Sequence, residues 1–135
     1  MINTDVQSKL DSYPDAARRC IEALRQVIFD VAVELEVGPV KESLKWHELS
    51  YSVSSGSPIR LNWKPEDPEN CYVCFHCQTK LVATFRELYG HGLDFQNNRS
   101  IKVPIDTWVK DPRLVHCFML AMTYHKVKHL PLLGA

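Results

Sequence analysis

Residues 43–77 read SLKWHELSYSVSSGSPIRLNWKPEDPENCYVCFHC, and this stretch decides the predicted fold. It holds β-branched and aromatic residues in short runs that turn-forming residues separate, which is typical of strands joined by tight connections. Because no helical pattern comes between these runs, they favour antiparallel pairing over a parallel, doubly wound sheet. The predicted strands are residues 43–46, 51–53, 59–63 and 71–77.

Helical patterns lie on both sides of this stretch. From residue 13 to residue 35, apolar residues recur at steps of three and four, as on the buried stripe of a long helix that Ser12 can cap and Gly38-Pro39 ends. A short helix is predicted over residues 79–90 and a further strand over residues 100–104. A closing helix is predicted after Asp111-Pro112, which has the form of a cap followed by proline in the first turn.

The expected order of elements is therefore helix, three or four strands, helix, strand, helix. We predict one α+β domain over residues 1–135, because a chain of this length can enclose a single core. Its antiparallel sheet of about four to five strands is expected to pack against two long terminal helices, with the short helix inserted.

Composition limits the classes of partner and the location. Sixteen basic residues balance 16 acidic ones, so no net field attracts the chain to nucleic acid or to an anionic membrane surface. The longest apolar run, residues 117–122, is far below the ~18 residues of a membrane span, and the N-terminus lacks the order of a signal peptide. We expect a cytoplasmic protein with a small-molecule or protein partner, and a homodimer is compatible with a domain of this size.

The five cysteines are expected to be reduced, because their odd number does not suggest a secreted disulfide framework. Cys71, Cys74, His76 and Cys77 form a cluster of soft ligands that could in principle hold zinc. On a strand, however, Cys71 and Cys77 would face one way and Cys74 and His76 the other, so the four groups would not converge. The sequence therefore predicts no metal site here, and it predicts no cofactor.

The segment 42–51, ESLKWHELSY, places an acidic residue before a Lys-Trp pair and an aromatic residue a few positions later. This signature resembles that of the YdhG-like family of small, largely uncharacterised bacterial proteins. Together with the preceding helix, the later strand pair and the helix and turn over residues 80–92, the resemblance covers residues 13–114. It implies a compact α+β fold, and a frataxin-like iron-chaperone role has been proposed for some members. It supplies no catalytic residue.

The same segment holds the candidate ligand-binding residues Lys45, Trp46, His47, Glu48 and Tyr51, because a large aromatic ring beside polar side chains can line a cleft. Strand alternation predicts Trp46 in the core and Lys45 and His47 on the outer face. The function predicted first is a non-catalytic binding module with a cleft near Trp46. Two others stay open: a metal-handling protein of the iron-chaperone type, with carboxylates on one face, and an acid–base enzyme using His47 and Glu48 or Tyr51.

Overall fold

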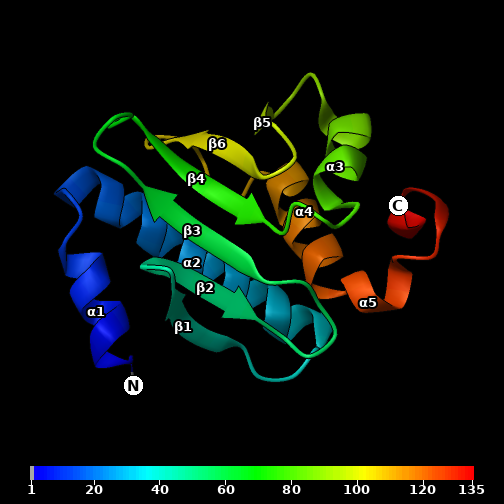
Figure 1. Cartoon of the computed structure of the whole chain (residues 1–135), viewed down its shortest axis with the longest axis horizontal. Coiled ribbons are helices and arrows are strands. Elements are labelled where there is room, and N and C mark those ends of the chain that lie inside the picture. The colour runs from blue at the N-terminus through cyan, green and yellow to red at the C-terminus, as the bar shows by residue number, and fades with distance from the viewer. Residues whose placement is uncertain (1) are drawn as a thin grey trace.

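The computed structural model describes residues 2–135. At its centre is one sheet of six strands in which every neighbouring pair is antiparallel (Figure 1). Sheet order follows chain order from β1 to β4, after which β6 pairs with β4 and β5 forms the far edge. The strands are β1 (Lys41–Lys45), β2 (Glu48–Ser52), β3 (Ile59–Trp63), β4 (Asn70–Phe75), β5 (Asp94–Gln96) and β6 (Ser100–Pro104).

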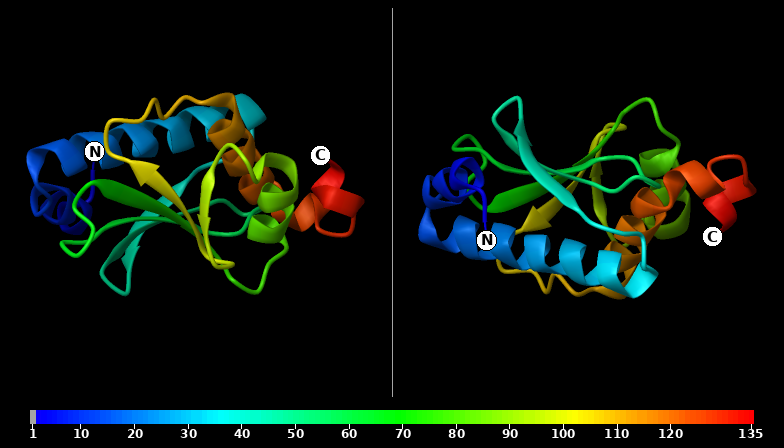
Figure 2. Two further views of the ribbon diagram at one scale, coloured as in Figure 1. Left: turned by 90° about the horizontal axis from the view of Figure 1, so that it is seen from above. Right: turned by 90° about the horizontal axis from the view of Figure 1, so that it is seen from below.

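The helices lie on one face and around the rim of this sheet (Figure 2). Helix α2 runs across the covered face and contacts β3, β4 and α4, while α1 contacts β1 and α3 contacts α4. No helix among residues 2–135 covers the opposite face, which we call the open face. None of the helices in the described part of the chain has both the length and the apolar character needed to cross a membrane. The helices are α1 (Thr4–Asp11), α2 (Asp15–Leu35), α3 (Leu81–Tyr89), α4 (Pro112–Met122) and α5 (Tyr124–Val127), followed by a 3-10 turn at Pro131–Gly134.

Alternation along the strands separates core residues from residues of the open face. In β3, Ile59 and Leu61 are buried on the covered face, whereas Arg60 between them is half-buried on the open face. The core therefore lies between the covered face and the helices, as the α+β prediction requires. Helix α2 contributes its predicted stripe of buried side chains: Ala17, Cys20, Ile21, Leu24, Val27, Ile28 and Val31.

The structure corrects several details of the prediction. The sheet has six strands rather than four or five, because the three-residue strand β5 is too short to show an alternating pattern. Only one of the two expected long helices is long: α2 has 21 residues, and α4 ends after 11. Ser12 does not cap α2 but ends the unpredicted helix α1, where its hydroxyl donates to the carbonyl of Lys9 at 2.5 Å. The cap at Asp111 is confirmed, since its carboxylate accepts from the Arg113 N–H at 2.9 Å.

One ion pair attaches the edge strand β1 to helix α2. Arg25 donates to both carboxylate oxygens of Glu42, from Nη2 at 3.0 Å and from Nε. The Arg25 and Glu42 side chains are only 25% and 11% exposed, and the guanidinium carbon lies 4.8 Å from the centre of the Phe29 ring. Bidentate pairs that are shielded from water are stronger than exposed ones. This pair therefore links β1 directly to α2, in addition to the pairing of β2 with β3.

Glu42→Gln is expected to lower the free energy of unfolding by roughly 2 kcal/mol, because a half-buried guanidinium then loses its charged acceptor. Urea unfolding followed by circular dichroism measures the change. The matched control is Asp15→Asn, which breaks the Arg18–Asp15 pair on the surface of α2, where the Asp15 side chain is 77% exposed. That loss should stay below about 0.5 kcal/mol. Equal losses in the two variants would show that the Arg25–Glu42 pair has no special role.

Candidate functional site

The five residues predicted from the segment 42–51 lie in three different environments. Lys45 ends β1 and Glu48 begins β2, and these two residues pair across the hairpin. Trp46 and His47 form the two-residue turn between them. Both turn residues have positive φ, 53° for Trp46 and 68° for His47, as a tight hairpin of this length requires.

The prediction that Trp46 belongs to the core is wrong, because its side chain is 86% exposed at the tip of the hairpin. Strand alternation does not apply to Trp46, since the chain reverses direction at this residue. Positive φ is sterically costly for a large side chain, and the usual residues of such turns are glycine, asparagine and aspartate. The turn could not be predicted from the sequence, because none of these usual residues occurs in the segment 45–48.

Glu48 and Tyr51 lie on opposite faces of the sheet. Glu48 is on the open face, where its Oε1 lies 3.7 Å from Nη1 of Arg60. Tyr51 is 1% exposed on the covered face, where burial and the neighbouring Glu42 carboxylate raise the pKa of its hydroxyl. The structure thus brings Lys45 and Glu48 together across the hairpin, but it does not bring His47, Glu48 and Tyr51 to one place.

A pocket of about 340 Å³ lies on the open face, and we call it the open-face pocket. Its centre is a row of paired strand residues, in which Arg60 of β3 lies opposite Cys74 of β4. Glu48 of β2 closes one side, and the segment after β4 and the residue before β6 close the others. The lining residues are Glu48, Pro58, Arg60, Cys74, Phe75, His76, Cys77 and Arg99. Of the five predicted site residues, only Glu48 lines this pocket.

The charges of the open-face pocket do not cancel. Arg60 faces Glu48 across 3.7 Å, a long contact, and Arg99 has no ion pair with any residue in the range 2–135. Two guanidinium groups therefore meet one carboxylate, and His76 adds an imidazole. Burial, followed by the charge of Glu48, raises the pKa of the Cys74 thiol to about 11, so Cys74 is a neutral, weakly polar part of the wall at neutral pH.

The cysteine cluster is arranged differently from the prediction at one position. Cys71 is buried on the covered face, and Cys74 and His76 line the open-face pocket, as alternation predicts. Cys77 was expected on the side of Cys71, but β4 ends at Phe75 and the chain then turns, so Cys77 lines the same pocket as Cys74. Within residues 2–135, no group of three or more His, Cys, Asp or Glu side chains is arranged to hold a metal ion.

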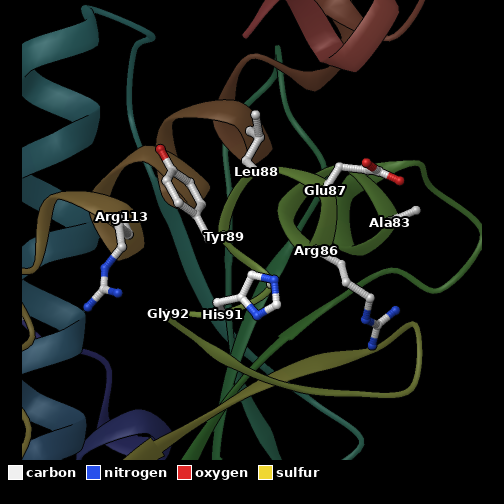
Figure 3. Close-up of a pocket in the computed structure, with 9 residues that line it drawn as sticks. Ala83, Arg86, Glu87, Leu88, Tyr89, His91, Gly92 and Arg113 are labelled. Carbon is white, nitrogen blue, oxygen red and sulfur yellow. The ribbon is translucent and has the colours of Figure 1, made fainter.

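A second, shallower depression of about 740 Å³ lies at the end of α3 (Figure 3). Its two arginines already have partners: Arg113 donates to Asp111 from Nε at 3.0 Å and from Nη2 at 2.5 Å, and Arg86 donates to the carbonyl of Asn97 at 2.6 Å. His91 lies between these arginines in Figure 3. Asp111 neutralises the charge of Arg113, and the Glu87 carboxylate lines the depression together with Arg86. The depression therefore lacks the excess of positive charge found in the open-face pocket.

No protein-family model matches the chain, and neither the curated proteins nor the solved structures give a significant match. The resemblance to the YdhG-like family therefore stays a prediction.

The sequence-based prediction of the binding site included only Glu48 among the residues that line the open-face pocket. Arg60 could have been found, because it alternates with Ile59 and Leu61 in a well-defined strand and therefore faces outward. Arg99 gave no such signal. It reaches the pocket only because β6 pairs with β4 in a register that places Ser100 opposite Cys74.

Proposed function

We propose that this protein is a non-catalytic binding module whose ligand is a small anion held in the open-face pocket. The observation that carries the proposal is the excess of positive charge there, with Arg60 only loosely paired to Glu48 and Arg99 without an ion-pair partner in the described chain. Guanidinium groups bind carboxylates and phosphates through charge-assisted hydrogen bonds, often with two bonds at once.

The size and the walls of the open-face pocket fit a small molecule. Ligand sites commonly enclose about 300–1,000 Å³, and the 340 Å³ here lie at the lower end of that range. Pro58, Phe75 and the neutral thiol of Cys74 supply apolar contact, while Arg60 and Arg99 supply the polar groups that orient a ligand. We therefore expect a compact organic anion with a carboxylate or phosphate group, which the arginines would bind.

We propose this site in place of the cleft near Trp46 that was expected first. Glu48 belongs to both, because it was one of the predicted site residues and also lines the open-face pocket. The metal-handling and acid–base readings stay predictions. The arrangement of residues 2–135 supplies no observation that favours either, because His47, Glu48 and Tyr51 are separated and no metal-ligand group is assembled.

The proposal is tested by calorimetric titration with sulfur-free anions, from mono- to tricarboxylates and including a phosphate monoester. Arg99→Gln is expected to weaken binding of the best anion about tenfold, because one charge-assisted hydrogen bond is lost. The matched control is Arg19→Gln, which neutralises an exposed arginine on α2, on the other side of the sheet. Equal affinities for wild type and Arg99→Gln, or no binding of any anion, would contradict the proposal.

A further inference from the structure

Cys77 is the exposed cysteine of this chain, and it stands in the wall of the open-face pocket. Cys20, Cys71 and Cys117 are buried, and Cys74 is half-buried in the same pocket wall. Two cysteines and two arginines therefore line one cavity, and Cys77 is the more exposed of the two cysteines. Exposed thiols beside cationic groups are those that react with dissolved disulfides.

The segment that carries Cys77 is held in place by its own hydrogen bonds. The N–H of Thr79 donates to the carbonyl of His76 at 3.1 Å, and the Thr79 hydroxyl donates to the same oxygen at 2.7 Å. The N–H of Gln78 donates to Nδ1 of His76 at 3.1 Å. Helix α3 then begins at Leu81. Cys77 thus lies in a hydrogen-bonded turn, in the wall of the pocket that Arg60 and Arg99 also line.

We propose that Cys77 is a modification site that forms a mixed disulfide with low-molecular-weight disulfides carrying carboxylate groups, of which glutathione disulfide is the representative. This inference rests on the proposed function, because it takes the anion held by Arg60 and Arg99 to be the acidic part of the thiol compound. The reaction is a thiol–disulfide exchange. The Cys77 thiolate attacks one sulfur of the dissolved disulfide, a new S–S bond forms, the original S–S bond breaks, and the released thiolate takes up a proton.

Cys74 does not undo this modification quickly. Resolution of a mixed disulfide needs a second thiolate, and burial keeps the pKa of the Cys74 thiol at about 11. At neutral pH the neighbouring sulfur is therefore almost entirely a thiol, which is not the attacking species. The adduct on Cys77 is expected to persist until an external thiol removes it.

The test is the rate of adduct formation on the reduced, full-length protein, followed by intact-mass spectrometry and peptide mapping. Glutathione disulfide, which carries carboxylates, is compared with cystamine, which carries ammonium groups. The preference of Cys77 is the rate with glutathione disulfide divided by the rate with cystamine. Because the two disulfides also differ in intrinsic reactivity, this preference is compared with that of N-acetylcysteine amide, a neutral free thiol. At low ionic strength we expect a preference of about tenfold for the anionic disulfide.

The variants assign the effect to the site. The preference should fall to that of the free thiol in an Arg60→Gln, Arg99→Gln double variant and persist in Arg19→Gln, whereas Cys77→Ser should form no adduct. An adduct on another cysteine, a preference no greater than that of the free thiol, or a preference that survives the double variant would overturn the inference. Calorimetry of a sulfur-free anion with wild type and with Cys77→Ser separates the two proposals: binding to both proteins leaves the anion site standing even where the exchange fails, and binding to neither removes both.

Discussion

Gly56→Ala is expected to lower the free energy of unfolding by about 3 kcal/mol, because the added methyl group has no room. A Cβ at Gly56 would lie 2.5 Å from the carbonyl oxygen of Ala121 and 2.6 Å from Cα of Met122. Both neighbours are backbone atoms at the end of α4, so neither can move aside as a flexible side chain would. The turn between β2 and β3 would have to move away from α4.

That movement would break the hydrogen bonds that end α4. The N–H of Ser57 donates to the Ala121 carbonyl at 2.9 Å, and the Ser55 hydroxyl donates to the Met122 carbonyl at 2.7 Å. In return, the carbonyl of Ser55 accepts from the N–H of His125 at 3.0 Å. The same turn leads directly into Pro58 and β3, so it also positions Arg60 in the open-face pocket.

Urea unfolding measures this loss, provided that the slope of the unfolding free energy against urea concentration is the same in the variant and in wild type. The control is Gly38→Ala. Gly38 has φ of 87° but nothing within 4 Å of an added Cβ, so backbone strain alone is expected to cost about 1 kcal/mol. If the two variants lost the same stability, close packing of the turn on α4 would not be the reason for glycine at position 56.

The second large effect concerns ligand binding. Arg60→Glu is expected to weaken the binding of a small anion about a hundredfold, because it removes a charge-assisted donor and places a negative charge beside Glu48. Calorimetric titration measures the affinity, and thermal unfolding monitored by circular dichroism checks that the variant is folded.

Glu48→Gln is expected to have the opposite effect, tighter binding of the anion, which a folding defect could not produce. Removing the Glu48 carboxylate frees Arg60, whose Nη1 lies 3.7 Å from Glu48 Oε1, so anion affinity is expected to rise a few-fold. A variant that merely damaged the fold would not bind more tightly. If Glu48→Gln bound anions more weakly than wild type, the ligand would have a positive group that needs Glu48, and a simple anion would be the wrong class.

Much of the fold could be predicted from local patterns. The stripe of α2 was visible because its apolar residues recur along most of a 21-residue helix, and the cap at Asp111 was visible because Asp-Pro is a strong helix start. The alternation of Ile59, Arg60 and Leu61 also indicates which side chains of β3 face outward, although the prediction did not use it. These signals lie within a few residues of one another, so a single sequence contains them.

The site could not be predicted in the same way, because its members depend on where strands end and which strands pair. Trp46 was assigned to the core because the two-residue turn at 46–47 has none of the residues that normally mark one. Cys77 was assigned to the wrong face because β4 ends two residues earlier. Arg99 joins Arg60 only through the pairing of β4 with β6, which joins segments 26 residues apart at Cys74 and Ser100.

The most direct test of the anion site is a nuclear magnetic resonance titration that follows the side-chain Nε–Hε signals of the arginines while a small organic anion is added. The signals of Arg60 and Arg99 are predicted to shift together and to saturate with one affinity, while those of Arg86 and Arg113 in the other depression stay in place. Shifts confined to Arg86 and Arg113, or no shift of Arg60 and Arg99 with any anion, would contradict the assignment of the binding site to the open face.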